Sequence, residues 1–180
     1  MKIGSLHATM PLNFKENSSE ALSTLFDAIQ GKSPQYEWYT KHVNQLGETT
    51  GEIIGGNLTV LCGLIGTKQM PDYQGKILFV EDVGEPLYAI DRLFYQLNNA
   101  GVLAQINGLV IGSFTNIKDS NPPYGSDLQS IIKAHFINHP IPIAFDFPAG
   151  HCDDNRALIF GKAAALKVDK NAATITYKEV

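Results

Sequence analysis

The chain has little cysteine, little excess charge of either sign and no long hydrophobic run. Its 180 residues include two cysteines, which are too few for a disulfide framework and suit a reducing compartment. The net charge is −4 and Lys and Arg form no cationic cluster, so neither nucleic acid nor an anionic membrane is expected as a partner. Apolar runs such as 77–80 are too short to span a bilayer, and the first residues lack the apolar stretch of a secretory signal. These absences predict a soluble, cytoplasmic protein.

The composition that remains is that of an ordinary globular protein, with 44% hydrophobic and 18% charged residues. No linker rich in Pro, Gly or Ser divides the chain, so residues 1–180 are expected to form one domain. Apolar residues at helical spacing predict three helices that start near Asn17, Pro86 and Asp127, and a short fourth one near Asn57. In the first helix, Asn17 is the expected N-cap and Glu20 completes a capping box.

Segments rich in β-branched and aromatic residues predict the strands. They are expected near 36–39 and at 76–80, 108–114, 141–145, 157–160, 163–168 and 173–177. The middle strands are continuous apolar runs separated by helices, which is typical of parallel strands buried on both faces. The last two alternate and are joined by residues 169–171, which indicates an antiparallel hairpin. The fold class is therefore mixed α/β, with parallel and antiparallel strands.

Acidic residues directly follow the apolar strand at 76–80. Glu81 and Asp82 come where the strand ends, and Glu85 precedes the next helix. Functional side chains gather at the carboxyl ends of strands in α/β sheets, because there they leave the core and converge. The alternative is that Glu81 and Asp82 are solvated turn residues, while Glu85 stabilises the helix N-terminus electrostatically.

A second polar loop follows the strand expected at 141–145. Pro148 and Gly150 fix a turn just before His151, and a histidine held in a rigid turn is a candidate general base. Cys152 and two aspartates follow, so a metal site is an alternative. Metal sites usually need a second ligand cluster, and the chain has no H-x-x-H or C-x-x-C motif, so no metal is expected.

Glu81 and His151 would make two members of a nucleophilic triad, and the third member is missing. The chain has no G-x-S-x-G motif, and no buried strand precedes Ser5 to present its hydroxyl. Cys152 adjoins His151 in sequence, which is poor geometry for proton transfer between the two. From the residues alone, the chain looks like half of a catalytic site.

The other histidines are isolated in the sequence. His135 and His139 lie four positions apart on one predicted helix, just before Pro140. We expect them to complement the dipole at the C-terminal end of that helix.

Several motifs, taken together and in order, resemble those of the LD-carboxypeptidase family, which includes murein tetrapeptide LD-carboxypeptidase and the microcin-immunity serine peptidases. They are Gly-Gly-Asn-Leu at 55–58, Gly-Thr at 66–67, the run Ile-Leu-Phe-Val-Glu-Asp-Val-Gly-Glu-Pro at 77–86 with the residues that follow it, and Phe-Pro-Ala-Gly-His at 147–151 with Asn155. Ordered agreement of several motifs is more specific than any one of them. The resemblance covers nearly the whole chain, but only the C-terminal half of the family.

The resemblance implies a C-terminal domain of swivelling β/β/α type that supplies Glu81 and His151 as catalytic residues. The nucleophilic serine would lie in a Gly-x-Ser-Asp elbow of a flavodoxin-like N-terminal domain, which is absent from this chain and is its expected partner. The implied activity is removal of the terminal D-alanine from muropeptide tetrapeptide stems in peptidoglycan recycling, without a cofactor. The chain alone would be inactive, and a homodimer is plausible because many soluble proteins form two-fold dimers.

One segment departs from the family pattern. The family commonly has His-Gly-Pro-Met shortly after the nucleophile, whereas this chain has His7-Ala8-Thr9-Met10, so the resemblance gives His7 little weight. Two other functions stay open. The first is a microcin-immunity-like hydrolase of peptidyl-nucleotide conjugates, and the second is a non-catalytic peptide-binding module.

Overall fold

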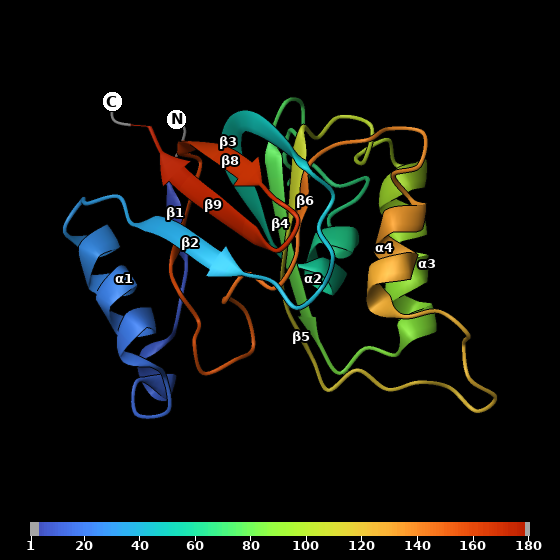
Figure 1. Cartoon of the computed structure of the whole chain (residues 1–180), viewed down its shortest axis with the longest axis horizontal. Coiled ribbons are helices and arrows are strands. Elements are labelled where there is room, and N and C mark those ends of the chain that lie inside the picture. The colour runs from blue at the N-terminus through green and yellow to red at the C-terminus, as the bar shows by residue number, and fades with distance from the viewer. Residues whose placement is uncertain (1–3, 179–180) are drawn as a thin grey trace.

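The structure, a computed structural model, describes residues 4–178 (Figure 1). Within that range the helices are α1 (Ser19–Ile29), α2 (Leu58–Gly63), α3 (Leu87–Asn99) and α4 (Leu128–Ala134), with a 3-10 turn η1 (Pro11–Asn13). The strands are β1 (Ser5–His7), β2 (Gln35–Tyr39), β3 (Gly47–Asn57), β4 (Ile77–Val83), β5 (Gly108–Thr115), β6 (Ile143–Ala144), β7 (Leu158–Phe160), β8 (Ala163–Val168) and β9 (Ala172–Tyr177). The predicted mixed α/β class is confirmed.

The main sheet has seven strands in the order β2-β9-β8-β3-β4-β5-β6, and β1 pairs separately with β7. Strands β3, β4, β5 and β6 run parallel to one another. By contrast, β8 is antiparallel to β3, and β9 pairs antiparallel with both β8 and β2. The predicted hairpin through 169–171 is therefore present. The parallel strands also end at one common edge of the sheet, which is where the acidic residues of β4 emerge.

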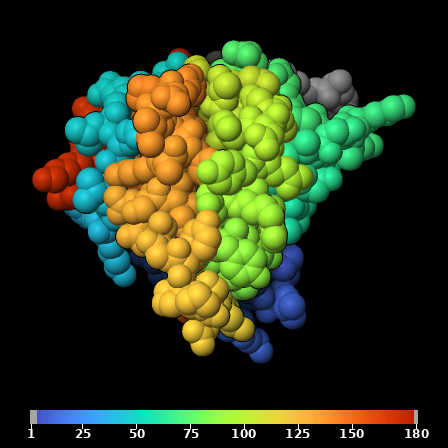
Figure 2. All heavy atoms as spheres, turned by 90° about the vertical axis from the view of Figure 1, so that its right-hand side faces the viewer, coloured from blue at the N-terminus to red at the C-terminus, as the bar shows by residue number. Residues whose placement is uncertain are grey.

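Helices α2, α3 and α4 lie together on one face of the parallel strands (Figure 1). Seen from that side, α3 and α4 run next to each other across the surface (Figure 2). Val80 of β4, Ile90 and Phe94 of α3 and Ile132 of α4 belong to the apolar core beneath them. The apolar stripe predicted for α3 thus faces the sheet, and its burial fixes β4 from this side.

A second core covers the opposite face of the sheet. Phe79 and Val110 pack there with Trp38 and Phe147. The indole Nε1 of Trp38 donates to the carbonyl of Phe145 at 2.7 Å, and its ring meets Phe147 edge-on with centroids 5.0 Å apart. These contacts anchor the segment that leads into the turn at His151.

Helix α1 has a different N-cap from the one predicted. The cap is Ser18, whose hydroxyl accepts a hydrogen bond from the Ala21 amide at 3.0 Å. Asn17 instead donates through Nδ2 to the carbonyl of Asp153 at 2.9 Å, so it ties the N-terminal segment to the turn after His151. Glu20 lies in the first turn but one position short of the place a capping box requires.

Strands β1 and β3 were not predicted. Glycines at 47, 51, 55 and 56 hide the alternation of β3. The packing of the sheet requires two of them, since a Cβ on Gly51 would lie 2.5 Å from the Gly75 carbonyl oxygen and one on Gly55 would lie 1.8 Å from that of Phe79. Within residues 4–178, no helix has both the length and the hydropathy needed to cross a membrane.

Candidate functional site

Glu81 and His151 meet at the carboxyl edge of the parallel strands. His151 Nδ1 lies 2.7 Å from Glu81 Oε2, although the residues are 70 positions apart in sequence. The Glu81 side chain is 2% exposed, whereas that of His151 is 54% exposed. Because Nδ1 is engaged with the carboxylate, Nε2 is the nitrogen left for proton exchange with another molecule. The structure thus brings the two predicted site residues together, and Glu81 is not a solvated turn residue.

The backbone around Gly150 holds His151 in place. Gly150 has a φ of 114°, and its amide donates to Asn155 Oδ1 at 2.9 Å. The Ser113 amide of β5 donates to the Ala149 carbonyl at 2.8 Å, and the Thr115 hydroxyl donates to the His151 carbonyl at 3.2 Å. A Cβ at position 150 would lie 2.8 Å from the Glu81 side chain, so the turn needs glycine there.

Asp82 has a structural role that differs from that of Glu81. It is 3% exposed and accepts hydrogen bonds from Asn57 Nδ2 at 2.8 Å and from the Thr59 amide and hydroxyl at 3.0 and 2.8 Å. Its Oδ1 also accepts from the Val83 amide at 2.8 Å. These bonds join the end of β4 to the first turn of α2, which excludes a solvated turn role for Asp82 as well.

His7 also lies at this site, although the resemblance to the family assigns it little weight. Its Nε2 is 4.0 Å from Glu81 Oε1, and its ring packs edge-on against Phe79 with centroids 4.9 Å apart. Burial lowers the pKa of His7; the Glu81 carboxylate opposes this shift and His151 adds to it. The sequence carries no signal for this contact, because strand β1 is only three residues long.

A cavity of about 620 Å³ opens over the Glu81–His151 pair. His7, Met10, Leu12, Glu16, Cys152 and Asp153 also line it. Met10 and Leu12 are 60% and 84% exposed, so two apolar side chains lie in the open beside the paired acid and histidine.

Within residues 4–178, no hydroxyl or thiol is hydrogen-bonded to the His151 ring. The Ser113 hydroxyl donates to the Ala149 carbonyl at 3.0 Å, and the Cys152 thiol contacts the Asp154 carbonyl at 3.5 Å. Burial raises the pKa of Cys152, which disfavours the nucleophilic thiolate. The described residues therefore contain an acid–base pair without an activated nucleophile. They also contain no group of three or more His, Cys, Asp or Glu side chains that could hold a metal ion.

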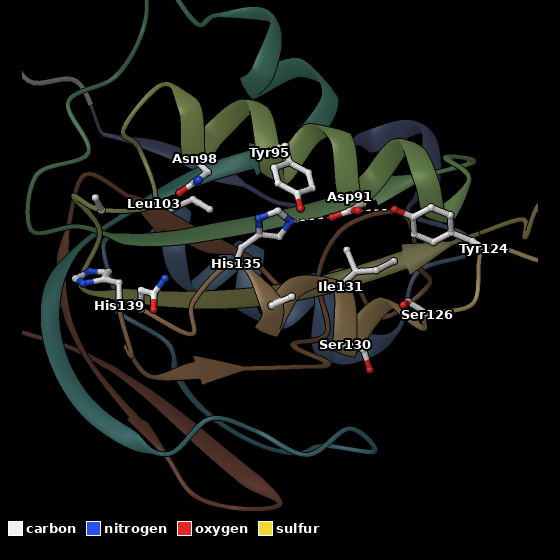
Figure 3. Close-up of a pocket in the computed structure, with 13 residues that line it drawn as sticks. Asp91, Tyr95, Asn98, Leu103, Tyr124, Ser126, Ser130, Ile131, His135 and His139 are labelled. Atoms are coloured by element: carbon white, nitrogen blue, oxygen red, sulfur yellow. Dashed lines mark hydrogen bonds and ion pairs between the residues drawn. The ribbon is translucent and has the colours of Figure 1, made fainter.

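A second cavity, of about 660 Å³, lies between α3 and α4 and shares no lining residue with the first (Figure 3). His135 Nε2 lies 2.8 Å from Asp91 Oδ1, and the Tyr124 hydroxyl donates to Asp91 Oδ2. Tyr95 meets the His135 ring edge-on, with centroids 4.6 Å apart. His135 lies at the C-cap of α4, where the sequence places it, and its ring also pairs with Asp91 of α3, a partner that the sequence does not indicate.

A mixed α/β domain with a carboxylate–histidine pair at the carboxyl edge of its sheet has the proton-transfer groups of a hydrolase. Residues 50–166 match the family model described as the LD-carboxypeptidase C-terminal domain. The chain belongs to the LD-carboxypeptidase family.

Individual relatives agree with this assignment. The chain is 32% identical over 142 residues to a protein of Bacillus subtilis named "Probable murein peptide carboxypeptidase", and this match covers 76% of the chain. It is 28% identical over 134 residues to the microcin C7 self-immunity protein MccF of Escherichia coli, across 72% of the chain. The crystal structure of muramoyltetrapeptide carboxypeptidase from Oxalobacter formigenes superposes with a TM-score of 0.85 at 29% identity, over 98% of the chain.

The chain matches only part of each relative. The matches cover 44% of the B. subtilis protein, 38% of the E. coli protein and 62% of the O. formigenes chain. The motifs predict that the chain corresponds to the C-terminal half of the family's proteins, and these partial coverages agree with that prediction.

Proposed function

We propose that this chain is the acid–base half of a serine-type LD-carboxypeptidase, and that its parent protein removes the terminal D-alanine from the tetrapeptide stems of muropeptides. The contact between Glu81 and His151, in a chain of this family, is the observation that carries the proposal. The bond cleaved would join D-alanine to a meso-diamino acid. The reaction would belong to peptidoglycan recycling in the cytoplasm, and no cofactor is needed for acyl transfer through a serine, a histidine and an acid.

In the proposed mechanism, a serine of the N-terminal domain attacks the carbonyl carbon of the scissile bond. His151 Nε2 accepts the serine proton and then donates it to the amine of the departing D-alanine. Water next attacks the acyl-enzyme; His151 takes a proton from it and returns one to the serine. Glu81 keeps the proton of neutral His151 on Nδ1 and stabilises the imidazolium that forms in each step. The N-terminal domain would also supply the oxyanion donors.

The surface around the cavity is consistent with a second domain that docks there. Met10 and Leu12 expose apolar side chains at its edge, and the matched relatives are much longer than this chain. A flavodoxin-like domain seated on this surface would place a serine over His151 and cover the apolar patch. The same patch would let the isolated chain associate with a second copy of itself.

The E. coli relative favours a second candidate function. It is named a microcin C7 self-immunity protein, so hydrolysis of a peptidyl-nucleotide conjugate is the alternative substrate class. Glu81 and His151 would act in the same way, and only the substrate pocket would differ. A non-catalytic peptide-binding module is the remaining alternative, and in that case His151 would not affect function.

The experiment compares the 180-residue chain with the longer protein that the proposal expects the same gene to encode. We expect the longer protein to release D-alanine from a murein tetrapeptide, and the isolated chain to release none. Faster cleavage of a peptidyl-nucleotide conjugate would favour the second candidate. Turnover by the isolated chain, or an upstream reading frame without a Gly-x-Ser-Asp elbow, would overturn the two-part site.

A further inference from the structure

His7 is a titratable side chain at the site that the proposed mechanism does not use. Its Nε2 faces Glu81 Oε1, the carboxylate oxygen that is not bonded to His151, at 4.0 Å. Phe79 and Phe160 pack against its ring, with centroids 4.9 and 5.9 Å away. The pairing of β1 with β7 sets His7 opposite Leu158, so its backbone is also held. The rings of His7 and His151 therefore face different oxygens of the buried Glu81 carboxylate.

The surroundings of His7 indicate where its proton lies. Among the described residues, Nδ1 is buried and has no hydrogen-bond partner. Burial is the largest influence on the ring and lowers the pKa of His7. The Glu81 carboxylate raises this pKa, His151 lowers it, and the backbone of His7 raises it by the smallest contribution, so the ring is neutral at neutral pH. A carboxylate only accepts hydrogen bonds, so a proton on Nε2 meets an acceptor. A proton on Nδ1 would leave a buried donor unpaired and turn a lone pair toward the carboxylate.

We propose that neutral His7, protonated at Nε2, is a positioning residue that holds the Glu81 carboxylate in the orientation that His151 requires. At 4.0 Å the interaction is that of an N–H dipole with a buried carboxylate, which a low local dielectric strengthens. With Oε1 directed at His7, Oε2 stays on His151 Nδ1. The inference rests on the proposed function, in which Glu81 must keep His151 in a single tautomer.

Two substitutions separate this role from simple packing. His7→Phe keeps an aromatic ring against Phe79 and Phe160 but removes the donor. His7→Gln keeps an N–H donor at about the position of Nε2 but loses the aromatic contacts. A positioning role predicts that Gln preserves the state of His151 and Phe does not, whereas a packing role predicts the reverse order.

The experiment is histidine side-chain NMR on the nitrogen-15-labelled 180-residue chain near neutral pH, which reports the tautomer of each ring. In the unaltered chain we expect His7 as the Nε2–H tautomer and His151 as the Nδ1–H tautomer. His7→Phe should lower the Nδ1–H to Nε2–H ratio of His151 by about threefold or more, and His7→Gln should leave it close to that of the unaltered chain. An Nδ1–H tautomer of His7 would overturn the proposal without any variant. So would an unchanged ratio in His7→Phe, or an equal fall in both variants.

Glu81→Gln, measured in the same way, separates this inference from the proposed function. If Glu81→Gln shifts the His151 tautomer and His7→Phe does not, the positioning role fails and the proposed role of Glu81 stands. If Glu81→Gln has no effect on the His151 tautomer, the proposed role of Glu81 fails, and the positioning role fails with it.

Discussion

The side chain of Glu81 is buried at the end of β4, and its Oε2 lies 2.7 Å from Nδ1 of His151, whose own side chain is half exposed. A buried carboxylate is costly unless it has a partner, and here its partner reaches out of the core. The pair therefore connects the interior of the sheet to the cavity above it. Proton transfer at Nε2 of His151 is the chemistry that this arrangement suits.

Asp82, next to Glu81 in sequence, is expected to serve stability. Asp82→Ala removes the acceptor for the Thr59 amide and hydroxyl and for Asn57 Nδ2, which leaves donors without partners near the core. We expect the free energy of unfolding to fall by about 3 kcal/mol, measured by urea denaturation. Asp72→Ala is the control, because Asp72 is exposed and the hydrogen bond that it accepts from the Gln74 amide is exposed as well. Equal effects of the two substitutions would contradict the structural role of Asp82.

Gly150 is expected to tolerate no side chain. Its φ is 114°, and a Cβ would lie 2.6 Å from Ser113 Oγ and 2.8 Å from Glu81. Gly150→Ala should therefore destabilise the fold by about 2 kcal/mol or more and displace the Glu81–His151 contact. Gly31→Ala is a matched control, because Gly31 has a φ of 82° with open space around its Cβ position. Thermal unfolding of both variants checks the difference, and similar losses at the two positions would contradict it.

The lowered pKa of His7 predicts a pH dependence of stability. Burial lowers the pKa of His7 in the folded chain below the ordinary value of 6.5. Between these two pKa values, the unfolded chain binds more protons at His7 than the folded chain does. The neutral His7 ring therefore makes its full contribution to the free energy of unfolding above pH 6.5. This contribution is lost as the pH falls toward the lowered pKa.

His7→Phe removes the titratable imidazole but keeps an aromatic ring at the same position. The stability difference between the unaltered chain and His7→Phe should therefore shrink, or reverse in favour of the variant, from about pH 8 to about pH 5. Urea denaturation at the two pH values measures it. A difference that is independent of pH would show that His7 has no shifted pKa.

The two thiols should react slowly with a disulfide reagent such as dithiobis(nitrobenzoate). Burial, with a smaller contribution from Asp82, raises the pKa of Cys62 to about 11, and Cys62 is 3% exposed. Burial also raises the pKa of Cys152, but that side chain is only partly covered. We expect Cys152 to react first, both to react more slowly than in the chain unfolded by denaturant, and Cys152→Ser to abolish the faster phase. A fast phase from Cys62 would show that α2 opens readily.

The residues that sequence reasoning could identify are those that follow strong local patterns. Glu81 and His151 each lie next to an apolar strand and a glycine-containing turn, which makes them candidates, and the resemblance to the family assigns them as catalytic residues. The apolar spacing of α3 is also regular. Strand β3 could not be identified, because close approach of neighbouring main chains selects glycines that erase its alternation. The contacts of His7 with Glu81 and of His135 with Asp91 depend on long-range packing, for which the sequence carries no local signal.

The central claim is that Glu81 acts through His151, and the turnover of Glu81→Gln in the proposed longer protein, which would carry the nucleophilic serine, tests it most directly. The measurement is the rate of D-alanine release from a murein tetrapeptide, with Asp72→Asn as the control at an exposed carboxylate. We predict that kcat falls by about 10³- to 10⁴-fold in Glu81→Gln, because the amide no longer fixes the reactive tautomer of His151. The control should keep full activity. A folded Glu81→Gln protein with kcat within about twofold of the unaltered enzyme would contradict the account.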